Sequence, residues 1–102
     1  MLTVVAKLQA APGKEEELKA ALTKMVAAVK ANEQGKAVAY SLHTANDDPA
    51  TFLFYEQYAD DDAVKAHGAT EHMGALNAAI REGGLLAGRP TIERYTKIAG
   101  VE

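Results

Sequence analysis

Hydrophobic and polar residues alternate along four stretches of the chain, and a period of two is typical of half-buried strands. The stretches cover residues 3–10, 37–44, 51–58 and 91–98. In the second stretch the alternation places Val38, Tyr40 and Leu42 on one face. The turn-forming residues 46–49 separate the second stretch from the third, so these two should pair as a hairpin. We therefore expect four strands.

Two other stretches have apolar residues spaced by three and four, which is typical of amphipathic helices. The first begins near Lys14, after Pro12-Gly13, and its acidic first turn suits the positive end of the helix dipole. The second follows the third strand and ends at Gly83-Gly84. We expect Gly68 to divide it into a short piece and a longer helix that begins near Thr70.

The order strand, helix, strand, strand, helix, strand predicts an α+β fold of the ferredoxin-like βαββαβ type. It has an antiparallel four-stranded sheet with both helices on one face, in a single domain over residues 1–102. The third strand is apolar on both faces, because Phe52 and Phe54 alternate with Leu53. Since apolar surface is costly to leave in water, we expect a homodimer packed sheet to sheet. The alternative is that Leu53 and similar residues are scattered surface positions.

Charge and composition exclude several classes of function. The 102 residues include 11 Lys and Arg against 14 Asp and Glu, so we expect no binding to nucleic acid or to an anionic membrane. The absence of cysteine excludes disulfide bonds, thiolate zinc sites and cysteine nucleophiles. No run approaches the roughly 18 apolar residues of a membrane span, and no signal peptide is visible. We therefore expect a cytoplasmic protein.

The three histidines are the first candidates for chemistry. The imidazole of His67 is suited to taking up a proton near neutral pH, and the helical pattern turns it toward the sheet. The alternative is a half-buried histidine that bonds a backbone carbonyl. His72 is a second candidate if the break at Gly68 brings both to one cavity, and a solvent-facing or capping residue if not. His43 lies on the strand face opposite Tyr40, so they cannot share a cavity, and we prefer Tyr40.

We expect neither a metal nor a cofactor. His67, Glu71 and His72 have the ligand types of an iron centre with two histidines and one carboxylate. His67 and Glu71 share a face only in a continuous helix, which Gly68 opposes, and His72 would then point elsewhere. The alternative for these residues is solvated charge. No Gly-x-Gly-x-x-Gly segment for a nicotinamide or flavin cofactor is present.

Polar residues of the third strand offer further contacts. Tyr55 and Tyr58 lie on opposite faces, and either is able to hydrogen-bond a ligand oxygen, although most strand tyrosines serve only in packing. Glu56 lies on the same strand face as Phe54. If this face is buried, the carboxylate needs a partner. We expect Arg94 to supply it in a structural ion pair.

Aromatic, acidic and histidine residues recur in a spaced pattern: Tyr40-Ser41-Leu42-His43, Asp48-Pro49, the run from Phe52 to Tyr58, His67, and Glu71-His72-Met73. In this pattern the chain resembles the antibiotic biosynthesis monooxygenase family over nearly its whole length. The resemblance implies a dimeric α+β barrel and a family that includes cofactor-independent quinol and polyketide oxygenases. Family members often carry Trp at the position of Tyr58, whereas this chain has no Trp.

Some relatives in that family degrade haem, using an Asn on the first strand and a Trp and a His in the second helical region. The matching positions in this chain are Ala6, His67 and Asn77. Because an amide is a poor iron ligand beside imidazole, we do not expect haem degradation here.

The residues and the resemblance together predict a cofactor-independent monooxygenase, an oxidoreductase acting on a small aromatic quinol or phenol between the helices and the sheet. We expect catalytic roles for His67 and His72, and substrate contacts from Tyr40, Phe54, Tyr55 and Met73. His67 takes the phenolic proton, a tyrosine holds the ring oxygen, and apolar side chains exclude water. Two alternatives are a non-catalytic dimeric module that binds a small hydrophobic ligand and an isomerase-like enzyme of the same barrel architecture.

Overall fold

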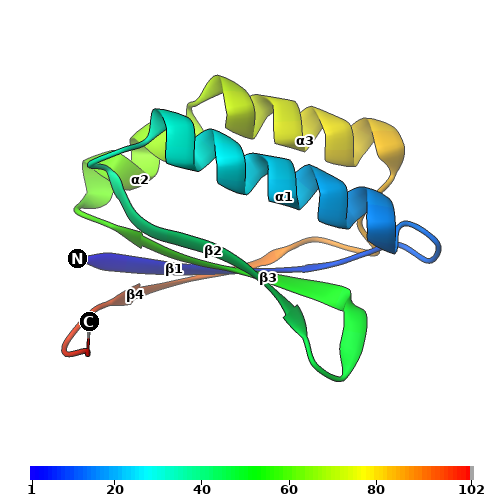
Figure 1. The fold of residues 1–102 in the computed structure, drawn as a ribbon, viewed down its shortest axis with the longest axis horizontal. Coiled ribbons are helices and arrows are strands. Elements are labelled where there is room, and N and C mark those ends of the chain that lie inside the picture. Colours follow the sequence, from blue (N-terminus) through cyan, green and yellow to red (C-terminus); the bar gives the residue numbers. More distant parts are fainter. Residues whose placement is uncertain (102) are drawn as a thin grey trace.

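A computed structural model describes residues 1–101 and contains one antiparallel four-stranded sheet, in the strand order β2-β3-β1-β4 (Figure 1). The strands are β1 (Leu2–Gln9), β2 (Ala37–Ala45), β3 (Asp48–Tyr58) and β4 (Thr91–Thr96). β3 begins earlier than expected, and the Asp48 carboxylate accepts hydrogen bonds from the Thr51 hydroxyl at 2.8 Å and the Ala50 amide at 3.0 Å. These bonds lower the pKa of Asp48.

All four expected strands are present, and the hairpin turn is shorter than predicted.

Three helices lie on one face of the sheet: α1 (Glu15–Asn32), α2 (Asp61–Gly68) and α3 (Glu71–Gly83). The expected break near Gly68 is confirmed. The Asp60 side chain caps α2 by accepting a hydrogen bond from the Ala63 amide at 2.9 Å, and the Thr70 hydroxyl accepts the Met73 amide at 3.2 Å to cap α3. α2 and α3 are therefore two separate helices with their own caps, and the break between them sets the position of the first turn of α3.

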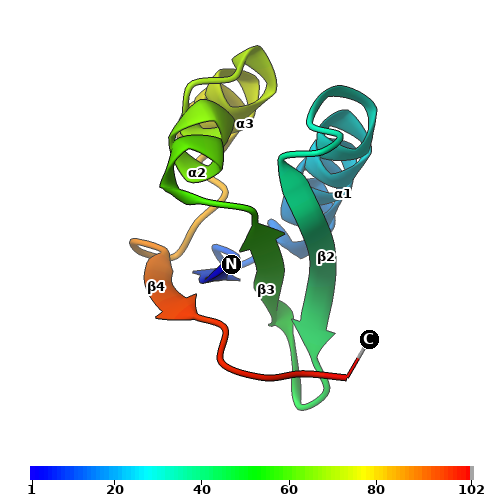
Figure 2. The same ribbon diagram turned by 90° about the vertical axis from the view of Figure 1, so that its left-hand side faces the viewer.

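The helices form one layer and the sheet another (Figure 2), and the buried residues of the hydrophobic core lie between the two. One face of α1 supplies four buried residues: Leu18, Leu22, Met25 and Val29. From the sheet, Phe52 and Phe54 of β3 are each 3% exposed, and Leu76 of α3 closes the other side. This packing fixes α1 over β2 and β3 and beside α3, and so fixes which residues the C-terminal end of α1 meets.

Val38 does not share the face of Tyr40 and Leu42, contrary to the alternation in the sequence. The pairing register of β2 with β3 shifts between Ala37 and Ala39, so Val38 is the extra residue of a bulge. Its side chain is 55% exposed, while Ala37, Tyr40 and Leu42 pack against the core.

The face of the sheet away from the helices carries apolar residues near its centre. Val5 and Leu53 are half-buried there, and Tyr55 is 37% exposed. Residues 97–101 run along this face (Figure 2) and share a recess with Tyr55. At the edge of the sheet, all residues of β4 are exposed.

No helix within residues 1–101 has the length and apolar character that crossing a membrane requires.

Candidate active site

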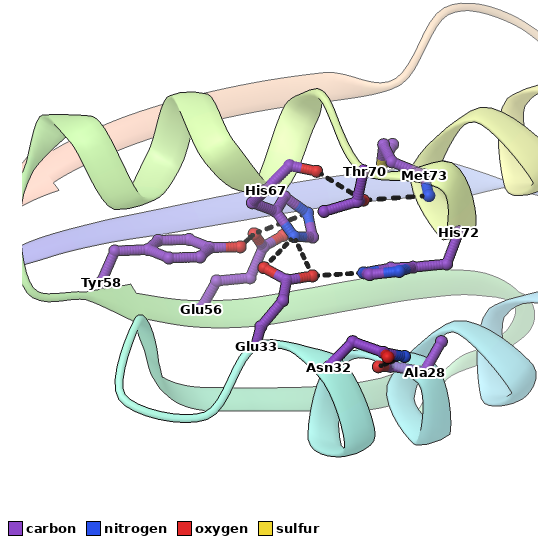
Figure 3. A network of polar contacts seen from close by, with 9 residues as sticks. All are labelled: Ala28, Asn32, Glu33, Glu56, Tyr58, His67, Thr70, His72 and Met73. Atoms are coloured by element: carbon purple, nitrogen blue, oxygen red, sulfur yellow. Dashed lines mark hydrogen bonds and ion pairs between the residues drawn. The ribbon is translucent and has the colours of Figure 1, made fainter.

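Five polar side chains converge inside the apolar layer, at the end of the molecule where the three helices approach one another (Figure 3). They are Glu33, Glu56, Tyr58, His67 and His72. All are buried except His72, whose side chain is 15% exposed. No fully buried side-chain nitrogen or oxygen within residues 1–101 lacks a hydrogen-bond partner.

Glu33 is the centre of this network. It is the C-cap residue of α1, where its amide donates to the Val29 carbonyl at 2.8 Å, and it is 3% exposed. Both carboxylate oxygens lie 3.0 Å from Nδ1 of His67, and Oε2 also contacts Nε2 of His72. One carboxylate therefore holds two imidazoles that belong to different helices.

The contact with Glu33 determines which nitrogen of His67 is available. An ionised carboxylate only accepts hydrogen bonds, so Nδ1 of His67 donates and a neutral ring keeps its lone pair on Nε2. That nitrogen faces the sheet, 4.0 Å from Oε1 of Glu56.

Glu56 and Tyr58 form the sheet side of the network. The Tyr58 hydroxyl donates to Oε1 of Glu56 at 2.5 Å, and Tyr58 is fully buried. Burial raises the pKa of the Glu56 carboxyl, against smaller lowering effects of the Tyr58 hydrogen bond and His67. Burial and the contact with Glu56 also raise the pKa of Tyr58. The expected partner, Arg94, is instead exposed on β4 and lies 3.8 Å from Asp61. The partner of Glu56 is the hydroxyl of Tyr58, two residues along the same strand.

The structure brings most of the expected site residues to one region. His67 and His72 meet at Glu33, and the rings of Tyr40 and Tyr58 each lie 5.4 Å from the His67 ring. The Phe54 ring lies beside the Tyr40 ring in a tilted arrangement, with the ring centroids 4.9 Å apart. Met73, at the start of α3, packs against the same core. Burial raises the pKa of Tyr40, so its hydroxyl keeps its proton.

Tyr55 does not join this group. It lies on the other face of β3, where it is paired with Val5 of β1. His43 is exposed on that same outer face, with Nε2 2.8 Å from the Ser41 hydroxyl, so it is separated from Tyr40 as expected. A contact between Tyr55 and a substrate beside His67 within one chain is therefore excluded by the sheet itself.

Two recesses reach the network from the surface. An apolar groove of about 110 Å³ between α1 and α3 has His72, Met25 and Leu76 in its walls. A wider recess of about 390 Å³ at the start of β2 is lined in part by Glu33 and Tyr40. The network thus borders solvent through His72 on one side and through Glu33 on the other, while His67 lines neither recess.

The carboxylate that joins the two histidines is Glu33, and not Glu71, which is exposed at the start of α3. In the sequence Glu33 stands among the residues that end the first helix and carries no motif of its own. One signal was present: a negative charge near the C-terminus of a helix is unfavourable to the helix dipole. An acidic residue at that position needs a compensating interaction, and here the two imidazoles provide it.

The chain is similar to known proteins over most of its length. The family model described as antibiotic biosynthesis monooxygenase matches residues 1–79. The PA3566 protein of Pseudomonas aeruginosa is 32% identical, with a TM-score of 0.86 over 96% of this chain and 94% of that one. A Caulobacter crescentus protein named for the same family is 35% identical, with a TM-score of 0.86 over 96% and 90%.

Rv0793 of Mycobacterium tuberculosis has a TM-score of 0.86 over 99% of this chain and 98% of its own, but at 20% identity it shows the fold alone. No curated protein matches the sequence.

Proposed function

The chain belongs to the antibiotic biosynthesis monooxygenase family, and from this premise we propose that it is a cofactor-independent monooxygenase that oxidises a small aromatic quinol or phenol. The observation that carries the proposal is the buried His67, with Nδ1 bound 3.0 Å from Glu33 and Nε2 left as the proton acceptor. A base oriented by a carboxylate is the arrangement that general-base catalysis requires.

The reaction needs no electron donor other than the substrate. Nε2 of His67 takes the phenolic proton, and the phenolate gives electrons to O₂ until a ring carbon carries a peroxide. His67 returns the proton to the outer peroxide oxygen and then removes the hydrogen from that ring carbon. The O–O bond breaks, the carbon becomes a carbonyl, and hydroxide leaves as water with the proton from His67. The phenol and O₂ thus give a quinone and water, with four electrons transferred from the ring to oxygen.

Other residues around His67 fit the needs of an electron-rich intermediate. The Tyr40 hydroxyl keeps its proton, since burial raises its pKa, and so serves as a hydrogen-bond donor to a ring oxygen. Phe54 and Met73 supply apolar surface that keeps water from the peroxide. His72 supports the site by sharing Glu33 with His67.

Oxygen consumption by metal-stripped protein tests this proposal. We expect at least one compound in a panel of quinols and hydroxylated polycyclic aromatics to be a substrate. The reaction should consume one O₂ per quinone formed, and with ¹⁸O₂ the quinone should contain one ¹⁸O atom. Product formation that continues under nitrogen would instead indicate the isomerase-like enzyme. Tight binding of panel compounds without oxygen uptake would indicate the non-catalytic module.

We further propose that the protein is a homodimer joined through the outer face of the sheet, and that its location is cytoplasmic. Val5, Leu53 and Tyr55 are neighbouring apolar residues on that face, and the exposed Lys7 lies directly beside Leu53 in the strand pairing. Neighbouring apolar residues on an otherwise uncovered sheet face are typical of surfaces that bind another protein. In such a dimer Tyr55 would serve in association, which accounts for an aromatic residue on the face away from His67.

Substitution of Leu53 by a charged residue tests the interface. We expect Leu53→Lys to raise the dimer dissociation constant at least tenfold, because a buried unpaired ammonium group is costly. Analytical ultracentrifugation measures the constant, with Lys19→Glu on the helix side as a control that leaves it unchanged. A wild-type protein that sediments as a monomer, or an equally stable dimer of the variant, would contradict the interface.

A further inference from the structure

Three donor atoms of the buried network lie within 4.8 Å of one another: one carboxylate oxygen of Glu33, one nitrogen of His67 and one of His72. They come from the end of α1, from α2 and from α3, so the fold itself gathers them. We propose that these three residues bind a divalent transition-metal ion of the Zn²⁺ type. This site goes beyond the proposed reaction, which uses no metal.

The separations of the donors suit such an ion. Ligands at about 2.0–2.2 Å in a tetrahedral site stand roughly 3.4 Å from each other. Nδ1 of His67 and Oε1 of Glu33 are already 3.0 Å apart. His72 has the most freedom to adjust, because its side chain is 15% exposed and borders the groove between α1 and α3. A shift of the His72 ring opens the space for the ion, and the groove gives a route from solvent and room for a fourth ligand.

The donor set indicates which ions fit. Two imidazoles and one carboxylate favour Zn²⁺, Co²⁺, Ni²⁺, Cu²⁺ and Fe²⁺ over Mg²⁺ and Ca²⁺, which prefer oxygen ligands alone. The charge is also suitable, because the Glu33 carboxylate is 3% exposed and a cation bound to it would offset the cost of burying that charge.

Glu56 is placed to support the bound state. A metal on Nδ1 leaves the proton of His67 on Nε2, which faces Oε1 of Glu56 at 4.0 Å. The separation is longer than a hydrogen bond, and a small shift of the ring on metal binding would let Glu56 accept from Nε2, which orients a metal-bound histidine. Glu56 itself is fixed by the Tyr58 hydroxyl at 2.5 Å. The network thus contains a ligand triad and an outer carboxylate.

Metal binding and the proposed base compete for the same ring. His67 with a metal on Nδ1 and a proton on Nε2 has no lone pair for a phenolic proton. We therefore expect Zn²⁺ to inhibit oxygen uptake by the metal-stripped enzyme in proportion to occupancy. Binding itself is measured without substrate, so its outcome does not depend on whether the proposed reaction occurs.

The test uses full-length, tag-free, metal-stripped protein titrated with Zn²⁺ by calorimetry and with Co²⁺ by visible absorption. We expect one ion per chain, a tetrahedral Co²⁺ spectrum and a higher thermal midpoint with Zn²⁺. His72→Ala should raise the dissociation constants of both ions at least tenfold, and Glu33→Gln should raise them further. His43→Ala removes the one histidine outside the cluster and should change nothing.

Equal affinity of His72→Ala and wild type, loss of binding in His43→Ala, or an octahedral spectrum typical of surface adsorption would overturn the proposal. Circular dichroism shows whether Glu33→Gln folds. Should it not, His72→Ala decides the question, because this part-exposed position tolerates truncation.

Discussion

The His67→Ala variant is expected to lose at least about a hundredfold in kcat/KM for oxygen uptake, since a positioned general base contributes roughly 10²–10⁴. His67 is the residue in the network with an acceptor nitrogen turned toward the sheet, and Glu33 at 3.0 Å fixes that orientation. The alanine leaves a cavity the size of an imidazole. Added imidazole should therefore restore part of the rate, which a purely structural role would not produce.

Lys65→Ala is the matched control for this experiment, because Lys65 is exposed on the same helix, two residues before His67. Its rate should equal that of the wild type. Full turnover by a folded His67→Ala variant on a verified substrate would show that His67 is not the base. The oxygen stoichiometry would then have to be explained without proton transfer to this ring.

The second large effect concerns stability. We expect Leu22→Ala to lower the free energy of unfolding by about 2–5 kcal/mol, the range for a leucine truncated in a close-packed core. Leu22 is fully buried between α1 and the sheet. α1 also ends in the residue that anchors both imidazoles, so loosening this helix should weaken the polar network as well.

Urea unfolding followed by circular dichroism measures this loss, at one fixed protein concentration because association would add to the apparent stability. Lys19→Ala, on the exposed side of α1, should change the value by no more than about 0.5 kcal/mol. A loss below about 1 kcal/mol for Leu22→Ala would mean that the layer repacks around the gap.

Most of the fold could be predicted from the sequence because each element has a local pattern. The spacing of apolar residues in α1, the turn residues before Asp48 and the glycines after α3 act on neighbouring residues only. Val38 was misplaced because a bulge depends on the register of two strands, which alternation in one strand does not determine.

The candidate site was only partly predictable for the same reason. His67 and His72 stood out as ionisable residues on a helix, and the break at Gly68 suggested that they could meet. Their partner Glu33 lies 34 and 39 residues before them, and only the packing of α1 brings it there. Tyr58 and Glu56 are two residues apart on one strand, so the sequence shows that they share a face. It does not show that both are buried, and their burial is what makes the hydrogen bond between them important.

The two edges of the sheet have a consequence for the behaviour of concentrated solutions. β4 has only six residues, all exposed, with Glu93 and Arg94 at its centre, and β2 is interrupted by the bulge at Val38. Short, charged or bulged edges are poor templates for strands of other molecules. The protein is therefore expected to resist polymerisation into β-rich fibrils, even though both edge strands of its sheet, β2 and β4, are unpaired on their outer sides.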